Sequence, residues 1–163
     1  MSQAPLPDPE TYRLAYQEAT RALDEQERAV DELRARAGTL FAAAAIATSF
    51  FGGQVLHRGH VPAMAWVAIG CFVALGGAIL AILWPRRDWE FALSPTLLIS
   101  TYIEPAAGNP VDLPAIHRDL ALHMDRSATQ NREQLRVLMA VFRGGVALLV
   151  IEMIAWVIVL ANG

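Results

Sequence analysis

The feature that most constrains this chain is the stretch from Asp112 to Leu160, which reads as one uninterrupted helix. Its first residue is a plausible N-cap, and Pro114 falls in the first turn, where a missing backbone N–H costs nothing. The second half, residues 137–161, is apolar apart from Arg143 and Glu152. At about 1.5 Å per residue, that half is long enough to cross a hydrocarbon core of roughly 30 Å. The pattern predicts a transmembrane helix with a long cytosolic root, residues 112–136.

Composition supports a membrane protein rather than a soluble domain. The 163 residues are 55% hydrophobic and only 18% charged, which is too apolar for an ordinary globular chain. The net charge of −3 argues against binding to a nucleic-acid polymer, which requires a basic face. The one cysteine lies inside an apolar run, so we expect no disulfide framework. The first ten residues lack the basic and apolar regions of a cleaved signal peptide.

The N-terminal part predicts a short disordered lead, residues 1–7, followed by a long cytosolic helix, residues 8–37. Pro9 and Glu10 are typical of a first helical turn. Apolar or small residues then recur at alternating steps of four and three, which is a heptad seam. The seam consists of Tyr12, Tyr16, Ala19, Leu23, Gln26, Val30, Leu33 and Ala37. We expect it to pack on the cytosolic root through Ile116, Leu120, Met124 and Leu135, although a seam between subunits is an alternative.

Two further spans are predicted, residues 38–56 and 62–84. No helix breaker separates residues 8–37 from the first span, so that helix should continue into the bilayer. The first span is rich in glycine, alanine, serine and threonine, which allow close approach of helices where burial provides no driving force. The link between the spans is so short that they must form an antiparallel hairpin.

The arginines predict the orientation. They cluster before the first and third spans and after the second, whereas only Arg58 falls in the hairpin link. The positive-inside rule then places the N-terminus in the cytoplasm and the C-terminus outside. Residues 85–111 are predicted to be a cytosolic or interfacial segment. Within it, Ser94 is a plausible cap for a short helix ending near Ile103.

Glu152 is the strongest candidate for a functional side chain. It falls near the middle of the third span, where an ionised carboxylate costs several kcal/mol unless it is paired or hydrated. Counted from the cytosolic ends, it is level with Thr48 and Ser49. Two interpretations remain open. The carboxyl either lines a polar path between subunits as a proton- or ion-linked residue, or it is a neutral acid that joins helices by a hydrogen bond to Thr48 or Ser49.

The arginines near the membrane surface also allow two interpretations. Arg143 and Arg136 would either extend to lipid headgroups or form a cation ring at a pore mouth. Arg86 and Arg87, with the helix start at Ser94, would either bind an anion such as a nucleotide phosphate or anchor to headgroups.

No arrangement of residues indicates catalysis or a metal or cofactor site. Asp119 and His123 have the i, i+4 spacing of two metal ligands, but no further ligand follows at useful spacing. We therefore interpret them, with His117 and Asp125, as a solvated helix face. The sequence also lacks the nucleophile, zinc and phosphate-loop motifs of common enzymes.

The order of elements resembles the transmembrane effectors of bacterial anti-phage defence, and most closely the Pycsar transmembrane effector domain. The matching parts are residues 33–40 at the start of the first span, Leu83-Trp84-Pro85-Arg86 after the second, and the long helix that enters the third. Where that family tends to have an acid and a lysine at the start of the first span, this chain has Glu32 and Arg36. The two-span SLATT effectors are less similar because they lack the third span.

The resemblance implies an oligomeric inner-membrane effector that perturbs or permeabilises the bilayer on a signal such as a cyclic nucleotide. Two alternatives remain from the residues themselves. One is a non-conducting scaffold that recruits a soluble cytosolic partner through its coiled coil, and the other is a small ion channel. In each case we expect an all-α, three-span, multi-pass protein of the bacterial inner membrane that contacts lipid and associates with copies of itself.

Overall fold

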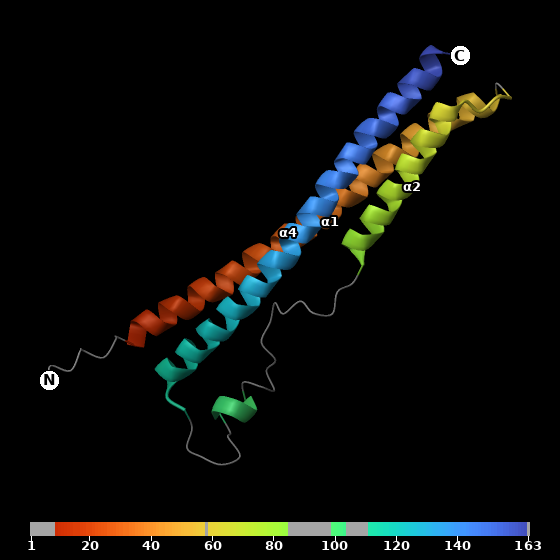
Figure 1. The fold of residues 1–163 in the computed structure, drawn as a ribbon. Helices are drawn as coiled ribbons and strands as arrows, with labels where there is room; N and C mark the ends of the chain where they lie inside the picture. The colour runs from red at the N-terminus through yellow and green to blue at the C-terminus, as the bar shows by residue number, and fades with distance from the viewer. Residues whose placement is uncertain (1–8, 58, 85–98, 104–110, 163) are drawn as a thin grey trace. The chain divides into compact units, whose positions relative to one another are not determined.

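The computed structural model describes residues 9–57, 59–84, 99–103 and 111–162, and within these ranges the protein is all-helical. The elements in chain order are α1 (Pro9–His57), α2 (Ala63–Leu83), the single π-helical turn η1 (Ile99–Ile103) and α4 (Leu113–Ala161) (Figure 1). The predicted all-α class and the continuity of the first and last helices are confirmed.

The ends of the two long helices follow from local sequence. α1 begins at Pro9, whose missing N–H is harmless in a first turn. At the start of α4 the carboxylate of Asp112 accepts a hydrogen bond from the N–H of Leu113 at 3.0 Å, and its carbonyl accepts one from the N–H of Ile116 at 3.1 Å. Asp112 therefore caps the helix, as its position in the sequence predicts.

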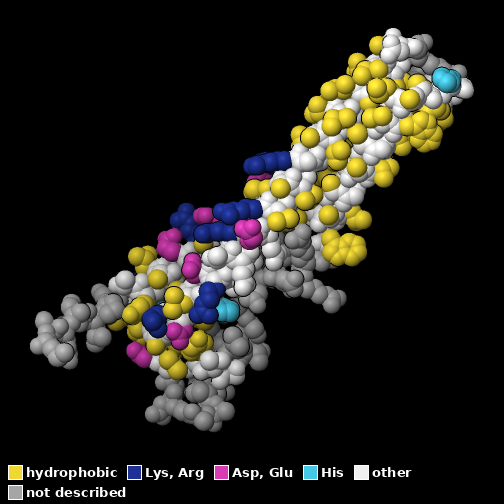
Figure 2. All heavy atoms as spheres, viewed as in Figure 1, with side chains coloured by type: hydrophobic (Ala, Val, Ile, Leu, Met, Phe, Trp, Pro, Cys, Tyr) yellow, Lys and Arg dark blue, Asp and Glu magenta, His cyan; other side chains and the backbone are white. Residues whose placement is uncertain are grey.

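The chain divides into two compact units, and α1 and α4 each contribute to both. The polar unit consists of Met1–Ala29 and Arg86–Gln134, and the apolar unit consists of Val30–Pro85 and Leu135–Gly163. Figure 2 shows charged side chains gathered over α1 and α4 in the polar unit and hydrophobic ones over the apolar unit.

In the polar unit the predicted seam of α1 packs on α4. Leu23 forms a buried cluster with Met124 and Ala128, and Tyr16 and Ala19 pack against its edge. This arrangement matches the predicted pairing with the root helix within one chain. Buried apolar area stabilises such a contact in water by about 25 cal/mol per Å².

In the apolar unit α1 and α2 form the expected antiparallel hairpin. The turn is closed by a hydrogen bond from the N–H of Gly59 to the carbonyl of Leu56 at 3.2 Å. Gly59 has a φ of +69°, a left-handed conformation that glycine adopts without steric cost. Near the other end of the hairpin, Phe41 stacks on Phe72 with ring centroids 5.5 Å apart.

α4 runs parallel to α1 in the apolar unit. The contacts between them rise together along both helices, from Leu40 with Gly145, through Thr48 with Glu152, to Phe51 with Trp156. Close approach depends on small residues, since a Cβ built on Gly145 would lie 3.1 Å from Leu75 Cδ1 and 3.6 Å from Leu40 Cδ2. Packing through small residues is characteristic of helices in lipid.

The outer surface of the apolar unit is hydrophobic. Its largest exposed apolar side chains include Ile46, Phe50, Leu56, Trp66 and Val73. α1, α2 and α4 are each long and apolar enough to cross a membrane, which is consistent with a multi-pass membrane protein. Water would disfavour such a surface, whereas lipid would not.

Part of the predicted interfacial segment lies outside the described residues. Of the short helix expected from Ser94 to Ile103, the structure describes only η1. The π turn is followed by a hydrogen bond from the N–H of Val111 to the carbonyl of Tyr102 at 3.3 Å.

Candidate functional site

Glu152 is completely buried on α4, with 0% of its surface exposed. It is held from α1, because the Thr48 hydroxyl donates a hydrogen bond to Glu152 Oε1. The structure thus brings together two of the three residues that the sequence placed at one depth. Ser49 is exposed instead, because one residue turns the helix by about 100° and carries this side chain away from α4.

The carboxyl lies one helical turn from a buried aromatic side chain of the apolar unit. Trp156, one turn further along α4, is 1% exposed and packs in a cluster with Val55, Ala65 and Ala68. Its ring centroid is 6.1 Å from that of Phe51. A Cβ built on Gly52 would lie 3.9 Å from Trp156 Cη2. The indole therefore packs directly over Gly52, where a side chain larger than alanine would compete with it for space.

Two buried polar atoms complete the site. Within the part of the chain that the structure describes, Glu152 Oε2 and Trp156 Nε1 are both buried without a hydrogen-bond partner. A neutral carboxylic acid has one O–H donor and remaining acceptor capacity. In the neutral acid, Oε1 accepts from Thr48 and the carboxyl proton stays on Oε2. A neutral acid in this setting avoids the several kcal/mol that an uncompensated charge would cost.

This geometry favours a hydrogen-bonded link between α1 and α4 over a pore-lining carboxylate. A residue that lines a hydrated path must contact water, and Glu152 has no exposed surface within the protomer. Its immediate neighbours are Thr48 and the aromatic cluster, and the fully buried side chains of the apolar unit also include Leu75 and Ile82. Around Glu152, the described interior of one protomer is therefore packed rather than open.

The predicted arginine sites are only partly described. Arg143 is exposed on α4, and Arg136 is exposed and has an interaction partner. Neither is near the buried carboxyl, since Arg143 precedes Glu152 by nine residues, or about 13 Å of helix. Arg86, Arg87 and Ser94 lie outside the described residues.

The histidine and aspartate residues on α4 do not all form a solvated face. Asp119, His123 and Asp125 are exposed, as expected. His117 is half-buried and stacks on Tyr16 with ring centroids 5.4 Å apart and an interplanar angle of 20°. The expectation for His117 is therefore wrong, because its ring packs against the α1 seam. Among the described residues, no cluster of three or more His, Cys, Asp or Glu side chains could hold a metal ion.

Sequence reasoning missed a buried polar layer in the polar unit. Ser127 and Asn131 on α4 are 5% and 1% exposed, and each has an interaction partner. On the facing helix, Gln26 Nε2 donates a hydrogen bond to the carbonyl of Ala128 at 2.9 Å. Ser127 and Asn131 continue the heptad of α4 that includes Leu120 and Met124. A search for apolar residues at that spacing does not identify them, because both are polar.

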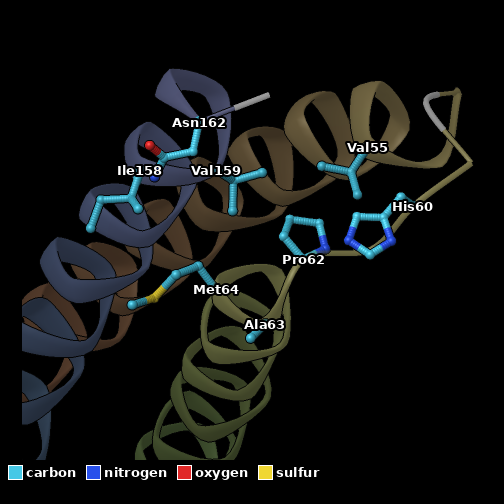
Figure 3. Close-up of a pocket in the computed structure, with 8 residues that line it drawn as sticks. All are labelled: Val55, His60, Pro62, Ala63, Met64, Ile158, Val159 and Asn162. Carbon is cyan, nitrogen blue, oxygen red and sulfur yellow. The ribbon is translucent and has the colours of Figure 1, made fainter.

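A cavity of about 370 Å³ lies where the end of α1, the start of α2 and the end of α4 meet (Figure 3). Two polar side chains, His60 and Asn162, contribute to a lining that is otherwise apolar. Its other residues are Val55, Pro62, Ala63, Met64, Ile158 and Val159. This lining suits an apolar group with one hydrogen-bonding end.

Comparison with protein-family models, curated proteins and solved structures finds no match for this chain.

Proposed function

We propose that this protein is an oligomeric inner-membrane effector that perturbs or permeabilises the bilayer in response to a signal. The observation that carries the proposal is the continuity of α1 and α4, which belong to both units without a helix break. A change in the pairing of the two helices in the polar unit would rotate or tilt their membrane halves. This coupling is what an effector needs to convert a cytosolic signal, such as a cyclic nucleotide, into a change in the bilayer.

Permeabilisation would arise from assembly rather than from a path inside one protomer. The described interior of the apolar unit is filled by large side chains such as Leu75 and Trp156. α2, in contrast, exposes a row of small residues at heptad spacing, namely Gly70, Ala74, Gly77 and Ala81. A Cβ at Gly70 or Gly77 would meet nothing within 4 Å. Such a row allows a helix of a second copy to approach closely in lipid.

The proposal is tested by membrane potential in bacteria that express the protein, with leakage of reconstituted vesicles as a second readout. We expect wild type to depolarise cells, either on expression alone or when a cyclic nucleotide is supplied, and to elute as an oligomer in detergent. Gly77→Leu should abolish both effects, because it fills the small-residue row without disturbing the protomer. Leu83→Phe, at an exposed position on another face of α2, is the matched control and should behave as wild type.

The buried carboxyl has a different role in this proposal. Glu152→Gln keeps the shape and hydrogen-bonding capacity of the link, so depolarisation should persist. Loss of depolarisation in Glu152→Gln at unchanged oligomer size would instead indicate an ion channel that uses the carboxyl. Absence of depolarisation under every condition, with the oligomer intact, would reject the effector.

A second function is favoured by the surface of the polar unit. Leu14 and Leu122 are 58% and 46% exposed, although polar helices in water tend to hide such side chains. They would suit a non-conducting scaffold that recruits a soluble partner through its coiled coil. Recovery of one cytosolic protein with wild type but not with Leu14→Ser/Leu122→Ser, in cells that stay polarised, would support this alternative.

A further inference from the structure

A groove runs along the outer face of the α1–α4 pair in the apolar unit. Its first part, with a volume of about 480 Å³, is bordered by Arg36, Thr39 and Phe142, among others. The second part, of about 430 Å³, is bordered by Phe50 and Met153, among others. Ala43 borders both, so the two parts adjoin at this residue.

The dimensions of the groove match a lipid chain. From Arg36 to Phe50 the α1 axis rises on the order of 21 Å, at about 1.5 Å per residue. One leaflet contributes about half of a hydrocarbon core of roughly 30 Å. The groove is therefore long enough to hold one acyl chain, with its methyl end near Met153.

Its charge is concentrated at one end. Arg36 borders the groove there, and Arg143 lies at a similar depth on α4, two residues before Gly145. Leu40 is level with Gly145. Arg36 precedes Leu40 by four residues and Arg143 precedes Gly145 by two. At about 1.5 Å per residue, they lie about 6 Å and 3 Å from that level, both toward the N-terminal ends of their helices. They lie near Gly38, where the sequence predicts the first span to begin, and hence near the headgroup region.

Both cations are accessible to an anion. Arg143 is exposed, and Arg36 pairs with the exposed carboxylate of Glu32 at 2.5 Å. Exposed ion pairs of this kind contribute little, so a phosphate can replace Glu32 as the partner of the guanidinium. Arginine binds phosphate oxygens in a bidentate manner. The remainder of the groove is lined almost entirely by apolar side chains.

We propose that this groove is a binding site for an anionic phospholipid, with its phosphate at Arg36 and one acyl chain along Ala43 toward Met153, and with Arg143 as a second cation at a similar depth. This site is separate from the small-residue row of α2 and does not depend on the effector activity. A zwitterionic lipid would fit the apolar groove equally well, but its positive headgroup would lie beside Arg36. The preference for an anionic headgroup would therefore come from the arginine end of the groove. The affinity would come from the arginine end and the apolar lining together.

The test is native mass spectrometry of the full-length, delipidated protein in detergent, titrated with dioleoyl phosphatidylglycerol or dioleoyl phosphatidylcholine. We expect phosphatidylglycerol to bind about tenfold more tightly than phosphatidylcholine. Ala43→Phe should block the groove and weaken phosphatidylglycerol about tenfold. Ala42→Phe is the matched control, because Ala42 is exposed on the same helix but does not border the groove. It should bind as wild type.

The role of the arginines at the end of the groove is tested separately. Arg36→Gln/Arg143→Gln should remove the preference for phosphatidylglycerol, whereas Arg28→Gln, at an exposed arginine of the polar unit, should retain it. Equal binding of the two lipids by wild type would overturn the proposal. So would an Ala43→Phe protein that changes its oligomer size but not its lipid binding, because the groove would then hold a second copy.

Discussion

The two units use the same pair of helices but hold them together differently. In the polar unit, α1 and α4 meet through Leu23, Met124 and Ala128, and water supplies the driving force for burial. In the apolar unit they meet through Gly145 and a carboxyl–hydroxyl link from Glu152 to Thr48. Lipid is as apolar as leucine, so close packing and hydrogen bonding must replace the hydrophobic effect there.

Each unit contains a buried polar link across the pair, and the links from Gln26 and Thr48 differ in their surroundings. Gln26 reaches a backbone carbonyl of α4 and leaves its own Oε1 buried without a partner. Thr48 donates instead to the side-chain carboxyl of Glu152, which is completely buried. We therefore expect the hydrogen bond to contribute a small part of the helix-pairing free energy in the polar unit, where the hydrophobic effect dominates. In the apolar unit, where lipid removes that effect, it should contribute a larger part. Four substitutions test this comparison.

The largest effect is expected for Leu23→Ala in the polar unit. Leu23 is 4% exposed, and its truncation leaves a cavity against Met124, which costs about 2–5 kcal/mol. Hydrogen exchange of residues 9–29 measures the loss as faster exchange of α1 in that range. Leu14→Ala, at a position that is 58% exposed, should leave exchange nearly unchanged, and an equal effect of both variants would contradict burial as the driving force.

The next largest effect is expected for Gly145→Leu in the apolar unit. The new side chain would begin 3.1 Å from Leu75 Cδ1, and overpacking of this kind costs about 1–3 kcal/mol. Thermal unfolding in detergent should shift to lower temperature. At Gly144 a Cβ would meet nothing within 4 Å, so Gly144→Leu should melt close to wild type. Similar melting of the two variants would mean that close approach is not what holds this unit together.

A smaller effect is expected for Thr48→Val, which removes the hydroxyl and keeps the shape. Hydrogen bonds between membrane helices contribute about 0.6 kcal/mol on average and about 1.7 at most. Reversible unfolding in mixed detergent measures the change. Ser49→Val is the control, because Ser49 is exposed and takes no part in the link. If Ser49→Val destabilises the protein as much as Thr48→Val, the link contributes nothing specific.

The smallest effect is expected for Gln26→Leu. It removes a buried hydrogen bond worth about 0.5–1.5 kcal/mol, but it also removes an unpartnered buried acceptor and adds apolar contact. The net change should stay within about 0.5 kcal/mol, read as hydrogen exchange of residues 9–29. A loss greater than that of Thr48→Val would reverse the comparison between the two units.

Much of the fold could be read from the sequence because its signals are local and periodic. The heptad residues of α1, from Tyr12 to Ala37, are all buried or half-buried, since a period of 3.5 residues places them on one face. The depth count that aligned Glu152 with Thr48 worked because both helices rise by the same amount per residue and run in parallel. The same count could not separate Thr48 from Ser49, since adjacent residues differ little in depth but by about 100° in direction.

Other parts of the site could not be read in this way. The stacking of His117 on Tyr16 and the burial of Asn131 depend on which face of α4 meets α1, and an apolar pattern does not identify a polar residue as buried. The groove at Ala43 is a property of two helices together, because neither α1 nor α4 has a groove when considered alone.

The sequence by itself determined where helices form, how long they are and which parts suit water or lipid, because these depend on residue type and spacing along one chain. Only the tertiary structure decided that Glu152 is enclosed by Thr48 and Trp156 rather than open to a path, and that Arg36 stands at the end of an apolar groove. Those outcomes depend on how two helices are rotated about their own axes. That rotation is fixed by many small contacts between residues far apart in sequence, such as Gly145 with Leu40 and Leu75.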